Sequence, residues 1–179
     1  NEWRLSNQKG ISFVPTMGNL HLGHKELIRE ARHLPENLVL ISIFINPLQF
    51  NDKEDLRNYP RTINKDIDLA FAAGADAIFI PYIDEIFPSN EKKIHYLKAS
   101  EQLSKTLCGI SRKGHFDGVC TVVKRLINIV KPELIFLGEK DWQQLLIIKD
   151  MVAKNTIRVA IKSIDTQRDI DGVPFSSRN

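Results

Sequence analysis

The sequence has few cysteines, no long apolar run and only a small excess of positive charge. Its two cysteines, Cys108 and Cys120, show no CxxC spacing, which disfavours a disulfide framework or a zinc site and is typical of unreactive thiols in a reducing compartment. No apolar run approaches the roughly 18 residues that a membrane span needs, and residues 1–10 hold no apolar signal core. We therefore expect a cytoplasmic protein without a membrane partner.

The charge balance also excludes a large class of partners. Lys and Arg number 25 against 22 Asp and Glu, a net charge of +3, far below the excess that marks a nucleic-acid-binding protein. We expect no nucleic acid partner, and any anionic ligand must be held by local groups. The 179 residues, 42% hydrophobic and 26% charged, suit one globular domain. Because the chain opens at Asn1 without Met and stops inside a motif-like run, we expect a fragment of a longer protein.

Strand and helix patterns alternate along the chain. The period of residues 119–130 is the strongest helical signal, and residues 82–107 are less regular, so we expect a small excursion there. We expect Trp142 to lie in the core. The alternation predicts an α/β, doubly wound parallel sheet of Rossmann-like type, with ligands at the carboxyl ends of the strands. The expected strands are 11–15, 38–45, 77–81, 134–137 and 158–164, and the expected helices are 25–33, 61–73, 119–130 and 142–153.

The segment 15–24, PTMGNLHLGH, lies between the first strand and the first helix. A helix start offers free amide donors and the positive end of the helix dipole, which suits a polyphosphate. His21 and His24 are three residues apart, so both rings can face one bound group and donate hydrogen bonds to charge that develops on phosphorus. A structural turn with two surface histidines is the alternative, and a metal site would lack a third ligand.

Two further segments offer groups for phosphate. Lys140 and Asp141 follow the strand 134–137 and open a helix, which places a mobile positive charge at the ligand-binding edge of the sheet. Asp141 could instead cap that helix. Ser176, Ser177 and Arg178 bring two hydroxyls and a guanidinium together, which suits a pair of β,γ-phosphates, although such a run is also common in loops.

Two glutamines could recognise an acid that carries hydroxyl groups. Gln49 lies just past a strand, and Gln144 lies one helical turn beyond Lys140. Each amide can both donate and accept, although a solvated glutamine is the commoner case at such positions.

These motifs together resemble one family. HxGH after a first strand resembles the signature of the nucleotidylyltransferase superfamily, which class I aminoacyl-tRNA synthetases share, and the full PTMGNLHLGH resembles the pantothenate synthetase (pantoate–β-alanine ligase) family. Five further segments match this family in order: IFINPLQF at 43–50, YPRT at 59–62, GHFDGVCTVV at 114–123, GEKDWQQL at 138–145 and SSRN at 176–179.

The resemblance implies an enzyme that joins pantoate to β-alanine with ATP, by way of pantoyl adenylate, and releases AMP and pyrophosphate. It makes residues 1–179 the N-terminal nucleotide-binding domain, without the C-terminal domain that closes over the site, so the isolated domain is expected to be weakly active. It also implies Mg²⁺, a homodimer formed through this domain, and the following roles. The catalytic residues are His21, His24 and Lys140; ATP contacts Pro15, Met17, His21, His24, Gly138, Lys140, Asp141, Ser176, Ser177 and Arg178; pantoate contacts Gln49 and Gln144; and Asp66 lies near the metal.

Some features leave other hypotheses open. Asn19, Asp165 and Phe175 depart from the residues that many relatives carry.

Another adenylyl- or cytidylyltransferase would need a basic cluster for a phosphorylated acceptor in place of the two glutamines. A nucleotide-binding or dimerisation module without catalysis is the third hypothesis. Arg112 and His115, before the long helix, could form a wall or lid of the pocket, and a flexible loop is the alternative.

Overall fold

Five parallel strands form one sheet in the order β3-β2-β1-β4-β5. The computed structural model describes residues 3, 6–88 and 96–178. The strands are β1 (Gly10–Thr16), β2 (Asn37–Ile43), β3 (Ala77–Phe79), β4 (Leu134–Gly138) and β5 (Ala160–Ile164). Every neighbouring pair runs parallel, and the order reverses where β1 lies beside both β2 and β4. The predicted doubly wound parallel sheet is confirmed.

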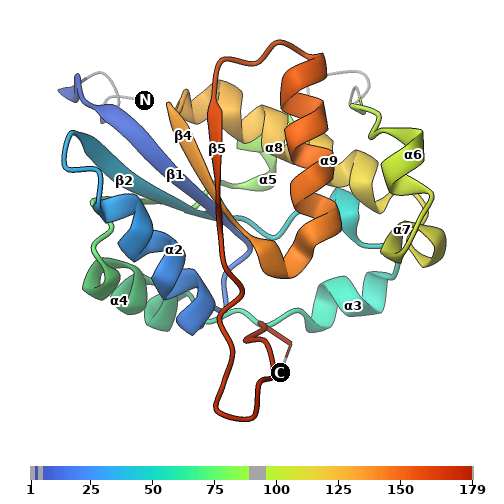
Figure 1. Ribbon diagram of the computed structural model, residues 1–179, viewed down its shortest axis with the longest axis horizontal. Helices are drawn as coiled ribbons and strands as arrows, with labels where there is room; N and C mark the ends of the chain where they lie inside the picture. The colour runs from blue at the N-terminus through green and yellow to red at the C-terminus, as the bar shows by residue number, and fades with distance from the viewer. Residues whose placement is uncertain (1–2, 4–5, 89–95, 179) are drawn as a thin grey trace.

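Helices cover both faces of the sheet (Figure 1). On one face, α2 (Leu22–Arg32) and α4 (Ile63–Ala73) pack against a core that includes Val14, Ile41 and Phe136. On the other face, α8 (His115–Val130) and α9 (Trp142–Lys154) pack against Phe13 and Leu40, among others. Side chains alternate along a strand, so each buried strand serves both cores.

The boundaries differ from the sequence prediction mainly at helix starts. α2 begins at Leu22 and α8 at His115, each several residues earlier than expected, because residues of the site motifs form the first turns. Sequence reasoning missed α3 (Lys53–Asn58), whose signal was the Asp52 carboxylate, which accepts a hydrogen bond from the Glu54 amide at 2.8 Å. It also missed the single turns η1 (Pro47–Gln49) and η2 (Glu139–Asp141).

Among the described residues, two short helices lie within the expected excursion at 82–107 and a third follows it directly. They are α5 (Ile83–Ile86), α6 (Glu101–Ser104) and α7 (Cys108–Ser111). The expectation for Trp142 was wrong: this side chain is 51% exposed, because the core face of α9 carries Leu145 and Ile148 instead. The stripe from Val119 to Val130 is buried as predicted.

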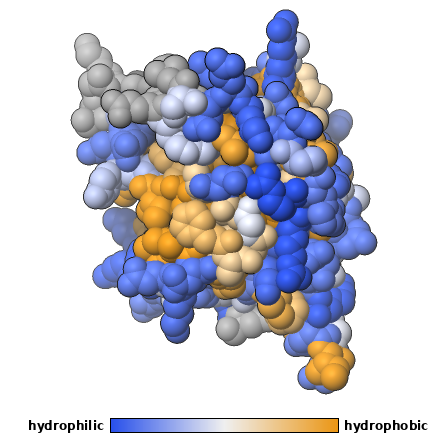
Figure 2. All heavy atoms as spheres, turned by 90° about the vertical axis from the view of Figure 1, so that its left-hand side faces the viewer, coloured by the Kyte–Doolittle hydropathy of each residue, from blue (hydrophilic) through white to orange (hydrophobic). Residues whose placement is uncertain are grey.

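The surface is polar over most of the face shown in Figure 2, with apolar side chains gathered near its middle. The exposed large apolar residues of α4 and of the segment after β3 include Phe71, Ile80 and Ile83. Among the described residues, none of the helices combines the length and the apolar character that crossing a bilayer requires.

Candidate active site

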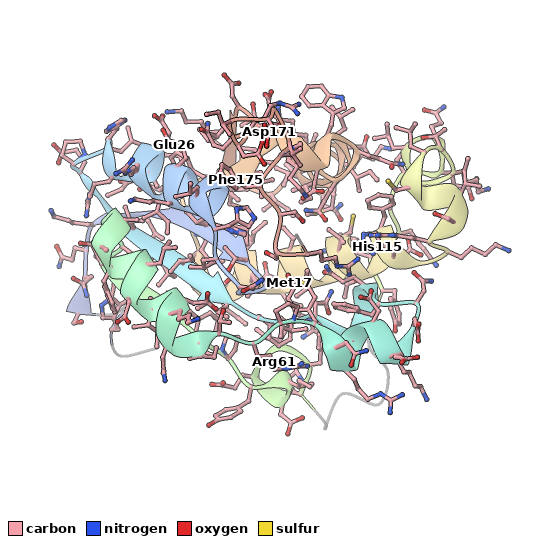
Figure 3. The ribbon with its side chains drawn as sticks, turned by 90° about the horizontal axis from the view of Figure 1, so that it is seen from below. Met17, Glu26, Arg61, His115, Asp171 and Phe175 are labelled. Carbon is pink, nitrogen blue, oxygen red and sulfur yellow. The ribbon has the colours of Figure 1, made fainter. Side chains whose placement is uncertain are left out.

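A cavity of about 750 Å³ opens at the carboxyl ends of the strands. Figure 3 looks at the molecule from this side, and the labelled Met17, His115 and Phe175 lie around the middle of the view. Every residue that the sequence predicted for ATP or pantoate lines this one cavity, and so do Arg112 and His115. The predicted residues that the cavity brings together are Pro15, Met17, His21, His24, Gln49, Gly138, Lys140, Asp141, Gln144, Ser176, Ser177 and Arg178.

The HLGH segment caps its own helix. His21 is the N-cap of α2, and its Nδ1 accepts a hydrogen bond from the Gly23 amide at 3.1 Å. The Nδ1 of His24 accepts one from the His21 amide at 3.3 Å. Because both Nδ1 atoms accept, each neutral ring carries its proton on Nε2. The two rings, with centroids 4.1 Å apart, therefore each present an Nε2–H donor.

The surroundings keep both imidazoles neutral. Burial, and then the Lys140 charge, lower the pKa of His21. Burial lowers the pKa of His24 to about 3, and the neighbouring His21 and Lys140 act in the same direction. At neutral pH the two rings are therefore hydrogen-bond donors without charge, and Lys140 supplies the positive charge on this side of the cavity.

Lys140 and Asp141 lie in the η2 turn between β4 and α9. The Lys140 ammonium lies 3.3 Å from the Asp141 carboxylate. Asp141 occupies the N-cap position of α9, but its side chain makes no capping hydrogen bond. Both side chains line the cavity, where the sequence placed them, and they pair with each other.

The amide of Gln49 is oriented by its neighbours. Asn46, which is 1% exposed, donates to the Gln49 Oε1 at 3.1 Å. The Gln49 Nε2 donates to the Met17 sulfur at 3.0 Å. Since Oε1 is already engaged, Gln49 is held with its donor end turned toward Met17 and the cavity.

The two glutamines at the start of α9 both line the cavity, but they differ in their other contacts. Gln143, which sequence reasoning did not single out, donates to the carbonyl oxygens of Leu103 and Thr106 at 2.7 and 2.6 Å and accepts from the Cys108 amide at 3.1 Å. Gln143 therefore ties the segment between α6 and α7 to α9, a role that no local sequence pattern signals.

The C-terminal segment returns beneath the sheet to the first strand's turn (Figure 1). The Ser177 carbonyl accepts from the Asn19 side chain at 2.7 Å, and the Ser177 hydroxyl donates to the Asn19 carbonyl at 3.0 Å. Arg178 pairs with Asp55 of α3 at 2.8 Å, and the Phe175 ring stacks on His21 at 6.4 Å between centroids. Asn179, the last residue of the SSRN motif, lies outside the described residues.

Asp66, which the resemblance placed near a metal, is 2% exposed and lies behind the turn that precedes the histidines. Its carboxylate accepts hydrogen bonds from the amides of Asn19 and Leu20 at 3.0 and 2.8 Å, and from the Thr62 hydroxyl at 3.0 Å. In the part of the chain that the structure describes, His, Cys, Asp and Glu residues form no group of three suited to a metal. Asp66 therefore stabilises this turn through the hydrogen bonds that it accepts.

The fold and the cavity define a nucleotidylyltransferase-like α/β domain, with an HxGH turn, a lysine and a serine–arginine segment around one cleft. The same fold occurs in a tyrosyl-tRNA synthetase of Leishmania major, with a TM-score of 0.58 and 12% sequence identity. The sequence model of the Pantoate-beta-alanine ligase family matches residues 1–179. The chain belongs to this family.

Individual relatives agree with the family match. A bifunctional pantoate ligase/cytidylate kinase of Prochlorococcus marinus strain MIT 9312 is 59% identical over 177 residues, which cover 99% of this chain. The chain spans only 35% of that relative's length. A pantothenate synthetase of Thermus thermophilus superposes with a TM-score of 0.92 at 42% identity, over 99% of this chain and 64% of the other. A Francisella tularensis pantoate–β-alanine ligase, complexed with β,γ ATP and β-alanine, superposes with a TM-score of 0.93 at 40% identity. The match covers 99% of this chain and 67% of the other.

Proposed function

We propose that this chain is the nucleotide- and pantoate-binding domain of a pantothenate synthetase, which joins pantoate to β-alanine at the expense of ATP. The observation that carries the proposal is the single cavity that collects the two histidines, Lys140, both glutamines and the Ser176–Arg178 run. The Francisella relative, whose structure holds an ATP compound and β-alanine, supports the same substrates for this chain.

In this proposal the triphosphate lies along the start of α2. The Nε2–H groups of His21 and His24 donate to phosphate oxygens, and the Lys140 ammonium neutralises their charge. The hydroxyls of Ser176 and Ser177 and the Arg178 guanidinium bind the β- and γ-phosphates, while Gly138 and Asp141 lie near the ribose. Pro15 and Met17 contact the nucleotide through the backbone that leads into the turn.

The acid is held on the other side of the cavity by Gln49 and Gln144. The pantoate carboxylate oxygen attacks the α-phosphorus in line, and the bond to the bridging oxygen breaks to release pyrophosphate. The β-alanine amine then attacks the acyl carbon of pantoyl adenylate, loses a proton, and AMP leaves with the electron pair of the acyl–oxygen bond. Positioning and preorganised donors supply most of the rate enhancement.

Magnesium accompanies ATP in this proposal. Mg²⁺ binds ATP chiefly through phosphate oxygens and water, with few protein carboxylates. Asp66 is buried, and its oxygens already accept three hydrogen bonds that hold this carboxylate against the turn before the histidines. The cavity residues therefore suit a metal carried on the phosphates, and the metal's chemistry is the neutralisation of phosphate charge.

A cytoplasmic homodimer, without nucleic acid or membrane partners, completes the proposal. The apolar side chains gathered on the face in Figure 2 support self-association, since large exposed apolar patches mark interaction surfaces. The dimer is tested by light scattering of the complete protein.

The reaction is tested by ATP–pyrophosphate exchange with the complete protein. Exchange that requires pantoate establishes acyl adenylate formation, whereas exchange with a phosphorylated acceptor instead would favour a different nucleotidylyltransferase. Calorimetric binding of ATP and pantoate without exchange would support a binding module. The same assay on residues 1–179 alone measures how much activity the isolated domain retains, which we expect to be weak.

His21→Asn separates catalysis from folding. The asparagine side chain keeps an acceptor for the Gly23 amide, so the cap of α2 survives, but it lacks the Nε2–H donor. Loss of one transition-state donor costs about 2.7–4 kcal/mol, so we expect pantoate-dependent exchange to fall roughly 10²- to 10³-fold. The thermal midpoint should stay near that of the wild type.

The matched control is His33→Asn, at the other end of the same helix, where the side chain is 71% exposed. This variant should exchange pyrophosphate at the wild-type rate. A wild-type rate in His21→Asn would refute the catalytic role of this ring.

A further inference from the structure

The GHFDG run at the start of α8 holds the turn that carries Gln49. η1 lies directly against the first turns of α8, with backbone facing backbone. A Cβ atom added at Gly118 would overlap the Leu48 carbonyl oxygen, so only glycine allows this approach. The Gly118 carbonyl in turn accepts a hydrogen bond from the Asn46 side chain at 3.1 Å.

His115 makes the contact nearest to Gln49 itself. It is the first residue of α8, it is 9% exposed, and its Nδ1 lies 2.6 Å from the Gln49 carbonyl oxygen. A carbonyl oxygen can only accept, so Nδ1 must carry the proton. Burial lowers the pKa of His115, the hydrogen bond to Gln49 opposes this, and Arg112 adds to the lowering. The neutral ring with Nδ1–H is the form that this geometry requires.

We infer that His115 is a positioning residue that fixes the backbone of Gln49, so that the Gln49 amide faces the bound acid. This inference rests on the proposed function, because it assigns the acid to Gln49. Asn46 fixes the side chain of Gln49 through Oε1, and His115 fixes its main chain through the carbonyl. With both ends held, the amide meets its ligand without first losing conformational freedom.

The inference predicts that loss of the His115 donor selectively weakens binding of the acid. ATP is bound by the start of α2, by η2 and by the C-terminal segment in the proposed function, and none of these depends on the bond between His115 and Gln49. Removing the Nδ1–H donor should therefore weaken binding of pantoate far more than binding of ATP. A generally loosened fold would weaken both.

Two variants of His115 test this in the complete protein. His115→Leu removes the donor while keeping a buried side chain. His115→Asn keeps an amide nitrogen the same number of bonds from Cα as Nδ1, so it can still donate to Gln49. We expect His115→Leu to raise the KM for pantoate roughly tenfold, because Gln49 must then lose conformational freedom when the acid binds. The KM for ATP should change less than about twofold, and His115→Asn should recover most of the loss.

A double-mutant cycle with Gln49→Ala completes the test. If His115 acts through Gln49, adding His115→Leu to Gln49→Ala should raise the pantoate KM little further. Equal rises in the KM for ATP and for pantoate, or full additivity with Gln49→Ala, would overturn the inference. So would a His115→Asn variant as impaired as His115→Leu. If the wild-type protein failed to bind pantoate at all, the proposed function would fall and the inference with it.

Discussion

Asp66 shows how one buried side chain sets the geometry of the turn that precedes His21 and His24. Its two carboxylate oxygens hold the amides of Asn19 and Leu20, just before the histidines. The residue also lies in the first turn of α4, where a negative charge is favoured by the helix dipole. The position of His21 therefore depends on a helix from another part of the chain.

Replacing Asp66 tests this dependence. Asp66→Ala leaves two amides that lack an acceptor, so we expect a loss of about 2–3 kcal/mol in the free energy of unfolding, together with reduced exchange activity. Asp66→Asn, which keeps one acceptor oxygen, should lose less. The measurement is denaturant unfolding of each variant.

Asp68→Ala is the matched control, because Asp68 is exposed on the same helix. Its unfolding free energy should stay within about 0.5 kcal/mol of the wild type. A similarly small change in Asp66→Ala would show that the turn does not need this carboxylate.

At the level of elements, η1 packs so closely on α8 that their backbones are in contact. The sequence pattern does not predict this contact. Gly118 lies inside a helix, where alanine would be the better helix former by about 0.5–1 kcal/mol. Overlap with a neighbouring backbone costs more, typically about 1–3 kcal/mol. The glycine is therefore explained by contact between two elements and not by the helix itself.

We expect Gly118→Ala to destabilise the protein by about 1–2 kcal/mol, because the overlap outweighs the gain in helix propensity. The displaced η1 turn should also weaken pantoate binding, which calorimetry would detect. Gly138→Ala is the control for stability, since a Cβ atom there meets nothing within 4 Å. A stabilised Gly118→Ala variant would contradict the packing seen between α8 and η1.

The elements were predictable where local chemistry decides them. Buried strands and the stripe from Val119 to Val130 follow from the hydrophobic period. Trp142 was misplaced, since a residue at a helix start can face solvent although it is aromatic. The clamp by Gln143 depends on distant segments, which no local pattern encodes.

The site was predictable to a similar extent. Motif resemblance named the residues that line the cavity, but their hydrogen bonds required the fold. The reciprocal cap of His21 and His24, which decides which nitrogen donates, is one example. The link from His115 to Gln49 is another, because it joins segments that are remote in sequence.

Across the whole molecule, the segment after β5 links the end of the chain to its beginning. It is held by the contacts of Ser177 with Asn19 and by the ion pair of Arg178 with Asp55. The side chains of Arg178 and Asp55 are both nearly half exposed. An exposed pair of this kind contributes about 0–1 kcal/mol. The segment should therefore open readily until a ligand bridges it to the sheet.

Limited proteolysis measures this opening. Arg168 is exposed within the segment, and we expect trypsin to cut after it in the free protein. ATP at ten times its Kd should slow that cut by roughly tenfold, because only the closed form binds. AMP lacks the β- and γ-phosphates and should protect less. Equal protection by AMP would contradict the placement of Ser176–Arg178 on those phosphates.

The reversal of strand order between β2 and β4 has a consequence for synthesis. β1 pairs with β4 although most of the chain lies between them. The histidines and Gln49 emerge from the ribosome early, whereas Lys140 and Gln144 emerge late, after the long helix. Distant pairings of this kind form slowly, since the intervening chain must first be ordered. A nascent chain halted before Leu134 carries His21, His24 and Gln49 but lacks Lys140, Gln144 and the strand β4 that pairs with β1.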